Sequence, residues 1–158
     1  MATKTELKRA FWELLEKERT VMLACTGVYP RPMTAMVENG RGPVWFFTSK
    51  ESDLVRDLGG RSRAAIQFAA KDHQLFAALD GELIADNDRA MIDELWNPFV
   101  AAWFEGGKDD PKLQLLRFEP SSGRVWENDN SLFAGVKLLL GRDPKKAYEA
   151  KVGDIRPN

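Results

Sequence analysis

Short β-prone segments separated by tight-turn signals fill the first half of the sequence, and this pattern most restricts the possible folds. Residues 20–26, 31–38 and 44–48 are rich in β-branched, aromatic or other apolar side chains. Turn signals separate them, at Gly27-Val28-Tyr29-Pro30 and at Asn39-Gly40. Connections this short join antiparallel neighbours, whereas parallel strands need long crossovers. The segments therefore predict an antiparallel meander rather than a parallel βαβ sheet.

The rest of the chain adds signals for further strands and a few helices. The additional strands are predicted at residues 63–70, 74–84 with a bulge at Asp80-Gly81, 113–119, and 124–128 after the turn Pro120-Ser121-Ser122-Gly123. Helices are predicted from the capping box Thr3-Lys4-Thr5-Glu6 through Leu15, over 51–58, from the caps Asp86-Asn87-Asp88 through Trp96, over 99–104 and over 131–140. This inventory indicates the α+β class, mainly antiparallel β, with a barrel of six to seven strands and peripheral helices.

Length and composition describe an ordinary globular domain. The 158 residues are 44% hydrophobic and 30% charged, which is typical of soluble proteins. We expect one domain over residues 1–140 and a charged C-terminal tail over 141–158. A formal net charge of -1 gives no reason to expect a nucleic-acid partner. No apolar run reaches membrane-spanning length, and residues 1–9 lack a signal-peptide core, so we expect a cytoplasmic protein.

The chain offers few reactive groups of its own. Cys25 is the single cysteine, which excludes an intramolecular disulfide and thiolate metal clusters. His73 is the single histidine, and the sequence has neither a Gly-x-Ser-x-Gly elbow nor two histidines at metal-ligand spacing. We therefore name no catalytic residue and expect no metal site. Either the protein binds a ligand without chemistry, or a cofactor carries the chemistry.

One stretch joins an aromatic strand to the start of a helix. Trp45-Phe46-Phe47 reads as a buried strand, and four polar residues follow it: Thr48, Ser49, Lys50 and Ser52. Free N–H groups and the helix dipole at such an end favour an anion. Arg31 would add a guanidinium if the second and third strands pair. The simpler interpretation is that Ser49 only caps the helix and the aromatic side chains only fill the core.

Four motifs occur in order and at suitable intervals within residues 5–128. They are Arg31-Pro32-Met33, Trp45-Phe46-Phe47-Thr48-Ser49, Ile92-Asp93-Glu94-Leu95-Trp96 and Ala102-Trp103-Phe104-Glu105-Gly106-Gly107-Lys108-Asp109-Asp110-Pro111. This series resembles the general stress protein branch of the pyridoxamine 5'-phosphate oxidase-like family. The resemblance implies an FMN-binding split barrel that works as a homodimer, with the flavin at the dimer interface.

The resemblance also implies roles for the first two motifs. Arg31 would meet the flavin phosphate or ribityl chain, and Pro32 and Met33 would line the flavin. Phe46 and Phe47 would offer backbone groups to the edge of the isoalloxazine ring.

Further positions carry over from the same resemblance. The phosphate would be held by Thr48, Ser49 and Ser52. Gln74 matches a glutamine that approaches the flavin in the oxidases, and Trp103 would help close the pocket, from the same or the partner subunit.

The phosphate corner departs from the family pattern at one position. Relatives carry a phosphate-contacting lysine where this chain has Leu54, preceded by Asp53. Losing a charge-assisted hydrogen bond costs on the order of 1.5–3 kcal/mol. Lys50 or Arg56 could supply the missing cation.

The C-terminus departs as well, because residues 145–158 do not match the segment with which the true oxidases grip pyridoxine phosphate. We therefore predict an FMN-binding general stress-type protein, a flavin-dependent oxidoreductase of unknown substrate rather than a pyridoxamine 5'-phosphate oxidase. The alternative is a non-catalytic ligand-binding or structural dimer with weakened or lost flavin binding. A third interpretation is a related barrel that binds deazaflavin or haem, with His73 as the haem ligand.

Overall fold

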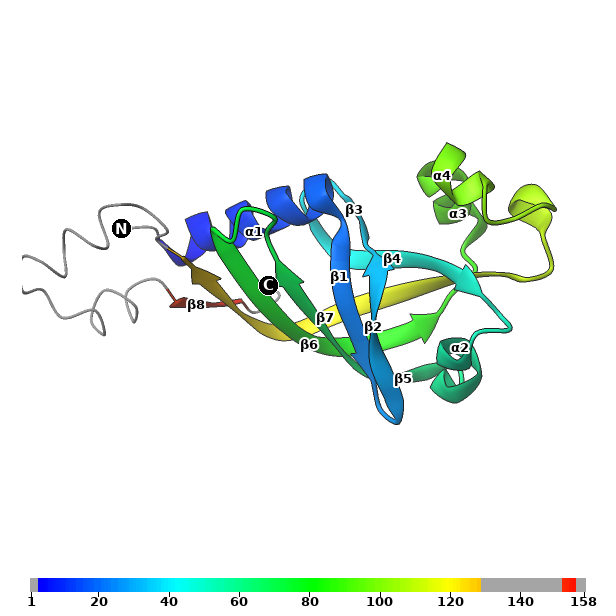
Figure 1. Cartoon of the computed structure of the whole chain (residues 1–158), viewed down its shortest axis with the longest axis horizontal. Coiled ribbons are helices and arrows are strands. Elements are labelled where there is room, and N and C mark those ends of the chain that lie inside the picture. Colours follow the sequence, from blue (N-terminus) through cyan, green and yellow to red (C-terminus); the bar gives the residue numbers. More distant parts are fainter. Residues whose placement is uncertain (1–2, 129–151, 156–158) are drawn as a thin grey trace, which may run out of the picture.

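The computed structural model describes residues 3–128 and 152–155, and within them the chain forms strands and short helices (Figure 1). In chain order the elements are α1 (Lys4–Glu18), β1 (Thr20–Cys25), β2 (Val28–Thr34), β3 (Met36–Glu38), β4 (Arg41–Ser49), α2 (Asp53–Leu58), β5 (Arg61–Ala69), β6 (Leu75–Ala85), α3 (Arg89–Leu95), α4 (Pro98–Ala101), the 3-10 turn η1 (Gly107–Asp109), β7 (Leu113–Glu127) and β8 (Val152–Ile155). In these residues no helix is long and apolar enough to cross a membrane.

The strands form one antiparallel sheet that curls into a half-barrel (Figure 1). The order is β2-β1-β5-β6-β7-β4-β3, with β8 paired to β7. This arrangement confirms the predicted α+β class and matches a split barrel. β2 and β3 lie at the two ends of this order although they follow one another in the chain, so the short link between them draws the sheet's ends together.

The predicted strand over residues 31–38 is two strands, which corrects the sequence interpretation. Ala35 interrupts it: this residue is fully buried, and its N–H donates to the carbonyl of Arg19 at 2.6 Å. Before the break β2 pairs with β1, and after it β3 pairs with β4. The chain changes partner because Ala35 is tied to the end of α1 instead of to a neighbouring strand.

The strands predicted at 113–119 and 124–128 are a single strand, β7, which is a second correction. The turn signal at Pro120–Gly123 is absorbed by a bulge, because Asp80 pairs with Ser122 while Gly81 pairs with Pro120. Gly81 is required at this bulge, since a Cβ there would lie 2.1 Å from the carbonyl oxygen of Glu119. The bulge predicted at Asp80-Gly81 is therefore confirmed, and it bends the two longest strands together.

The helix ends follow local capping rules. Thr3 and Glu6 form the predicted capping box, with Glu6 N–H donating to Thr3 Oγ1 at 3.1 Å and Thr3 N–H donating to Glu6 Oε2 at 2.8 Å. Asp88 caps α3, and Asn97 caps α4. The helix predicted over 99–104 is the single turn Pro98–Ala101.

The C-terminal expectations have different outcomes. The helix predicted over 131–140 lies outside the described residues. Within the segment predicted as a charged tail, β8 pairs with β7 and Gly153 packs close to Leu7 of α1, so this part joins the sheet. The division into a domain over 1–140 and a tail over 141–158 stays a prediction.

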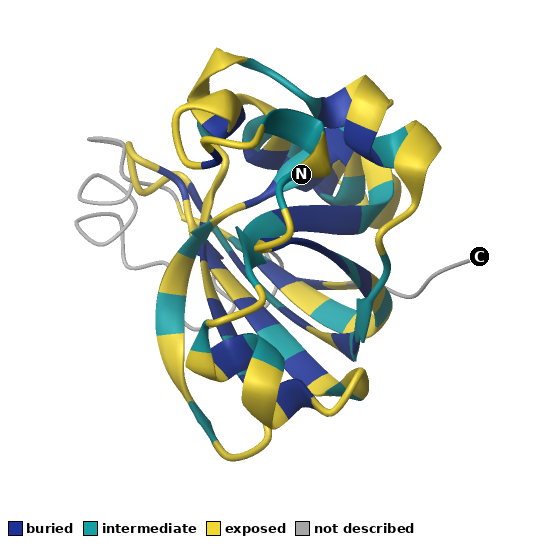
Figure 2. Cartoon of the chain, turned by 90° about the vertical axis from the view of Figure 1, so that its right-hand side faces the viewer, coloured by how far each residue is buried: buried dark blue, intermediate teal, exposed yellow. Residues whose placement is uncertain are grey.

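Two apolar clusters lie on opposite faces of β4. Val44 and Phe46 point into the barrel core, which α1 covers with its buried side chains. Figure 2 shows buried positions, in dark blue, along the strands of the sheet. Trp45 and Phe47 point the other way, into a second cluster with Ile92, Leu95, Val100, Phe104, Leu113 and Leu115. We call residues 86–112, which carry α3, α4 and η1, the helical lobe. β4 is thus the shared wall between the barrel core and the helical lobe.

Candidate functional site

Hydroxyl groups shape the corner where β4 ends and α2 begins. Ser52 caps α2, because its Oγ accepts from the Val55 N–H at 3.3 Å, and the Thr48 hydroxyl lies 3.5 Å from the same oxygen. Ser49 turns the chain: its Oγ accepts from the Glu51 N–H at 3.1 Å and its carbonyl accepts from the Ser52 N–H at 3.0 Å. The predicted helix is confirmed, but it begins at Asp53 rather than at residue 51, with Ser52 rather than Ser49 as its cap.

Arg31 is a half-buried cation on β2. It lies on β2 opposite Leu23, and β2 approaches both α2 and β4 without pairing with them. Burial raises the pKa of the Cys25 thiol, while Arg31 lowers that pKa and Asp57 of α2 raises it, so these three side chains share one neighbourhood. Within the described residues Arg31 takes part in no ion pair. A partly desolvated guanidinium without a carboxylate is suited to a bound anion.

Two of the other charged side chains near the corner form an ion pair with each other, and a third forms none among the described residues. Asp53 is paired with Arg56 at 2.6 Å, so the acid is neutralised and Arg56 is engaged. Lys50 is exposed and forms no ion pair within the described chain, which leaves it as the free lysine of the corner. Leu54 is 1% exposed and belongs to the barrel core, so position 54 faces inward here rather than toward a phosphate.

The backbone of β4 has an open edge at the same place. The Lys50 N–H donates to the Lys112 carbonyl at 2.7 Å, in register with the ladder between β4 and β7. Hydrogen-bonded positions alternate in an antiparallel ladder, so Thr48 also bonds to β7 while Phe47 and Ser49 direct their N–H and C=O groups to the opposite edge. There β3 pairs no further along β4 than Trp45. In the described residues no strand pairs with Phe47 on that side.

The other residues of the first two motifs lie around this edge in different ways. Phe46 is fully buried in the barrel core, and the same alternation directs its N–H and C=O groups to β7 rather than to the open edge. Phe47 is half-buried and meets Trp96 edge-on, with ring centroids 6.0 Å apart. On β2 the Pro32 side chain is exposed, whereas Met33 is half-buried against the barrel core.

The structure does not bring Gln74 to the corner within one chain. Gln74 precedes β6, and β6 reaches the corner end of the barrel only at Ala85, opposite Leu116. The 11 residues of β6, at about 3.3 Å each, separate the two ends by roughly 35 Å. His73 lies in the same distant turn, with φ 59° and its ring stacked on Phe76.

Trp103 lies on the surface of the helical lobe and is 84% exposed. It follows α4 and does not cover the corner in its own chain, so its predicted part in closing the pocket stays a prediction.

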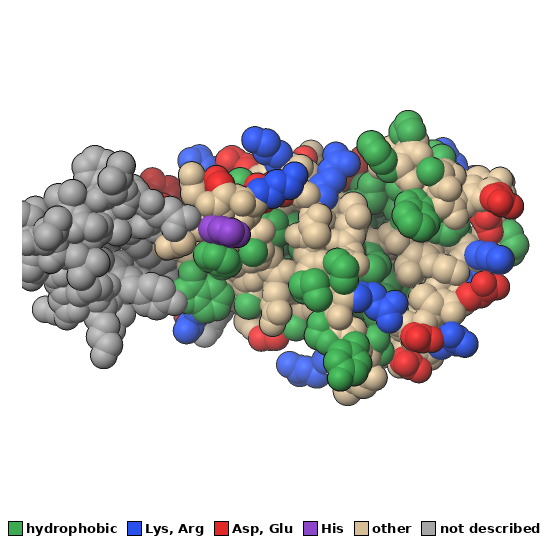
Figure 3. Space-filling view, viewed as in Figure 1, with side chains coloured by type: hydrophobic (Ala, Val, Ile, Leu, Met, Phe, Trp, Pro, Cys, Tyr) green, Lys and Arg blue, Asp and Glu red, His purple; other side chains and the backbone are tan. Residues whose placement is uncertain are grey.

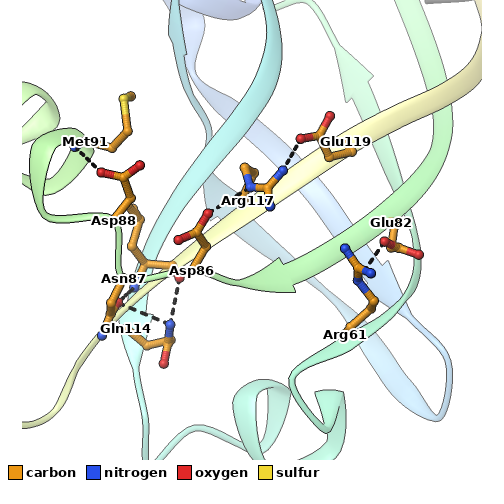
Figure 4. A network of polar contacts seen from close by, with 10 residues as sticks. Arg61, Glu82, Asp86, Asn87, Asp88, Met91, Gln114, Arg117 and Glu119 are labelled. Carbon is orange, nitrogen blue, oxygen red and sulfur yellow. Dashed lines mark hydrogen bonds and ion pairs between the residues drawn. The ribbon is translucent and has the colours of Figure 1, made fainter.

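Sequence reasoning missed a polar network behind the corner (Figure 4). Asn87 and Gln114 are joined by a hydrogen bond of 3.2 Å, and Arg117 binds both Asp86, at 3.0 Å, and Glu119. The triplet Asp86-Asn87-Asp88 was interpreted only as helix caps, and Asp88 alone caps α3. Nothing in the local sequence marks Asn87 as a partner of β7, since the residues it bonds lie 26 to 28 positions away.

Comparisons with known proteins agree with this fold. The family described as "Pyridoxamine 5'-phosphate oxidase like" matches residues 6–149. A general stress family protein from Xanthomonas campestris pv. campestris is 50% identical with a TM-score of 0.78, covering 84% of this chain and 94% of that one. The general stress FMN/FAD binding protein of Xanthomonas citri is 49% identical with a TM-score of 0.77, covering 81% and 93%.

Two more distant relatives extend the series. General stress protein 26 from Jannaschia sp. CCS1 is 32% identical with a TM-score of 0.76, over 90% of this chain and 94% of that one. Protein bli-3 of Neurospora crassa is 28% identical over 91 residues, 52% of this chain and 44% of that protein, so the chain spans less than half of its length. The chain therefore belongs to the pyridoxamine 5'-phosphate oxidase-like family, in its general stress protein branch.

Proposed function

We propose that the corner between β2, β4 and α2 binds FMN. The observation that carries this proposal is Arg31, a half-buried guanidinium without a carboxylate partner in the described residues. It lies on β2, the strand that approaches β4 and α2, which are joined by the hydroxyl-rich turn of Ser49 and Ser52. The related protein of Xanthomonas citri, which is an FMN/FAD binding protein, supports the same cofactor class. FMN fits better than a larger dinucleotide because the corner offers one anion-binding end and one open backbone edge.

Different residues of the corner would contact different parts of FMN. Arg31, Lys50 and the hydroxyls of the corner would hold the phosphate through charge-assisted hydrogen bonds. Ser52 is suited to this because its oxygen accepts from the Val55 N–H while its own O–H stays able to donate. The free N–H and C=O groups of Phe47 would pair with the polar edge of the ring, with Pro32 and Met33 against its face.

We propose further that the protein is a flavin-dependent oxidoreductase of unknown substrate. Bound FMN would supply hydride or electron transfer, and the chain's residues bind the ring, orient it and exclude water. No side chain of the described residues stands out as acid or base at the corner, so the catalytic residues stay unassigned. The cytoplasmic location also stays a prediction.

A homodimer with the flavin at the interface completes the proposal. Among the described residues, large apolar side chains are exposed on the helical lobe, Phe99 at 80% and Trp103 at 84%, and on the barrel, Tyr29 of β2 at 91% and Met22 of β1 at 39%. Figure 3 shows hydrophobic side chains gathered on the surface of the helical lobe. These exposed apolar side chains support an association site, which we propose lies between two copies of the chain. A second copy would cover both patches, and Trp103 of one protomer would then close the pocket of the other.

The direct test is a titration of dialysed protein with FMN, followed by flavin fluorescence and visible absorbance. We expect saturation equimolar with the chain, in the micromolar range or tighter. A flat titration would overturn the proposal. Riboflavin in parallel measures what the phosphate contributes, since riboflavin carries the ring and ribityl chain without it.

The alternative is a non-catalytic dimer that has weakened or lost flavin binding. One observation favours it: position 54 supplies no lysine, and Arg56 is engaged by Asp53. This alternative predicts that Lys50→Met leaves any FMN binding unchanged, because no phosphate would be held there. The FMN proposal predicts a several-fold rise in the dissociation constant.

A further inference from the structure

Behind the corner, the outer edge of β7 lacks a strand. β6 pairs with β7 only as far as Ala85 opposite Leu116. The N–H and C=O groups of Gln114 face β4, whereas those of Leu113 and Leu115 face the outer edge, which has no β6 partner here. The chain leaves β6 here, and the Asp86 N–H makes one more bond, to the Leu115 carbonyl at 3.0 Å. The remaining backbone groups of this edge need another partner, since buried unpaired groups are costly.

The side chain of Asn87 takes the place of the missing strand (Figure 4). Its Oδ1 accepts from the Leu115 N–H at 2.7 Å, and its Nδ2 donates to the Leu113 carbonyl at 3.2 Å. The same Oδ1 accepts from Gln114 Nε2 at 3.2 Å, and that nitrogen also donates to the Leu115 carbonyl at 2.8 Å. An asparagine suits this role because its amide carries both a donor and an acceptor, as a peptide group does.

The residues that Asn87 holds lie directly opposite the corner. Leu113, Gln114 and Leu115 pair with Ser49, Thr48 and Phe47. Directly opposed residues of antiparallel strands have Cβ atoms about 4.5–5.5 Å apart and share a face of the sheet. Gln114, which is 8% exposed, is therefore the cross-strand neighbour of Thr48, whose hydroxyl in turn lies 3.5 Å from Ser52 Oγ.

We propose that Asn87 and Gln114 are positioning residues of the phosphate corner, which fix Thr48 and Ser49 by fixing the strand behind them. The inference rests on the proposed FMN site, because it assigns the contacts that hold that site's hydroxyls in place. It also gives the helical lobe a part in ligand binding, since Asn87 lies where the lobe leaves the sheet.

If Asn87 only stabilised the helical lobe, its replacement would act like the loss of any other contact in the lobe. Asp88, the next residue, provides the matched control for this possibility. Asp88 caps α3 from the adjacent position, accepting from the Met91 N–H at 3.2 Å, and makes no bond to β7 among the described residues. Asp88→Ala therefore loosens the helical lobe without releasing Leu113–Leu115. Asn87→Asp keeps the size and the acceptor but removes the donor to the Leu113 carbonyl, and Gln114→Met removes the amide at similar volume.

The first measurement compares dissociation constants for FMN and riboflavin. We expect Asn87→Asp and Gln114→Met to weaken FMN about tenfold and riboflavin much less, because the displaced groups would contact the phosphate. Asp88→Ala should leave the ratio of the two constants as in the wild type. An unchanged ratio in the Asn87 and Gln114 variants would overturn the inference.

The second measurement needs no flavin, so it separates this inference from the proposed function. Hydrogen–deuterium exchange of the amides of residues 48–52 should speed up in Asn87→Asp and Gln114→Met but not in Asp88→Ala. If the wild-type protein binds no FMN, the proposed function is overturned. The exchange comparison still decides whether Asn87 and Gln114 position the corner. Equal exchange in the wild type and the three variants would overturn the positioning role of Asn87 and Gln114.

Discussion

The barrel and the helical lobe are built on the same strand, β4, yet they are held together differently. The barrel has continuous ladders between β5, β6 and β7 and a core closed by α1. The lobe has two short helices over a small cluster, with surface ion pairs such as Arg89 with Asp109 and Lys108 with Asp93. Exposed pairs contribute little stability. The comparison indicates a rigid barrel and a lobe with its own, lower unfolding free energy.

The largest effect is expected in the barrel core. Phe118 is fully buried on β7 between the partners Val44 and Leu83. Phe118→Ala should lower the free energy of unfolding by about 3–5 kcal/mol, from lost burial and the cavity left behind. Chemical denaturation followed by circular dichroism would measure it. A loss confined to one part of the chain, with the rest of the sheet unaffected, would contradict the barrel as a single cooperative unit.

The same kind of deletion in the lobe should act locally. Leu95 is 7% exposed in the second cluster, and Leu95→Ala should cost about 2 kcal/mol, near the lower end for such changes. Amide exchange should rise within residues 89–104 while the strands β5 to β7 keep their protection. Equal loss of protection in the barrel would show that the lobe is not a separate unit.

Helix caps sharpen the contrast at a smaller scale. Thr3→Ala and Asp88→Ala each remove an N-cap, at a cost of about 1 kcal/mol. Because α1 covers the barrel core, the first change should lower the global unfolding midpoint. The second should mainly increase exchange in α3. Limited proteolysis of the two variants distinguishes global unfolding from local opening of the helical lobe. Cleavage of both variants at the same places would count against separate stabilities for the barrel and the lobe.

The smallest effect concerns the contact between the two regions. Burial, a hydrogen bond to Glu94 and the nearby charges of Glu94 and Glu16 raise the pKa of Glu38 on β3. The protonated carboxyl therefore stabilises the fold at low pH, and this stabilisation is lost as the pH rises through the raised pKa. Glu38→Gln should accordingly raise the melting temperature slightly at neutral pH and change little near pH 4.

The matched control for this titration is Glu105→Gln, because Glu105 is an exposed carboxylate of the lobe. It controls for the loss of one surface carboxylate. If the melting temperature of Glu38→Gln differed from that of the wild type by the same amount at every pH, the pH effect would not come from Glu38 and Glu94.

Local signals in the sequence predicted the fold where structure is local. The capping box at Thr3, the Asn39-Gly40 turn with φ of 57° and 61°, and the bulge at Gly81 all follow from neighbouring residues. The break at Ala35 and the continuous β7 depend on partners distant in sequence, so the strand signals gave the wrong boundaries there.

In the site, too, the features set by neighbouring residues were predictable and those set by distant partners were not. The hydroxyl turn before α2 was predictable from capping chemistry, but the position of Arg31 was not, because β2 pairs with β1 and only approaches β4. Asn87 could not be found, since its partners are set by where β6 ends.

The most direct test of the flavin site is the pair Arg31→Met and Arg41→Met, compared with the wild type by FMN titration. Arg41 is an exposed arginine at the opposite end of β4, so it controls for the loss of one positive charge. We predict that Arg31→Met weakens FMN about tenfold or more, with a smaller effect on riboflavin, while Arg41→Met binds both as the wild type does. Equal FMN affinity in all three proteins would contradict a phosphate site at this corner.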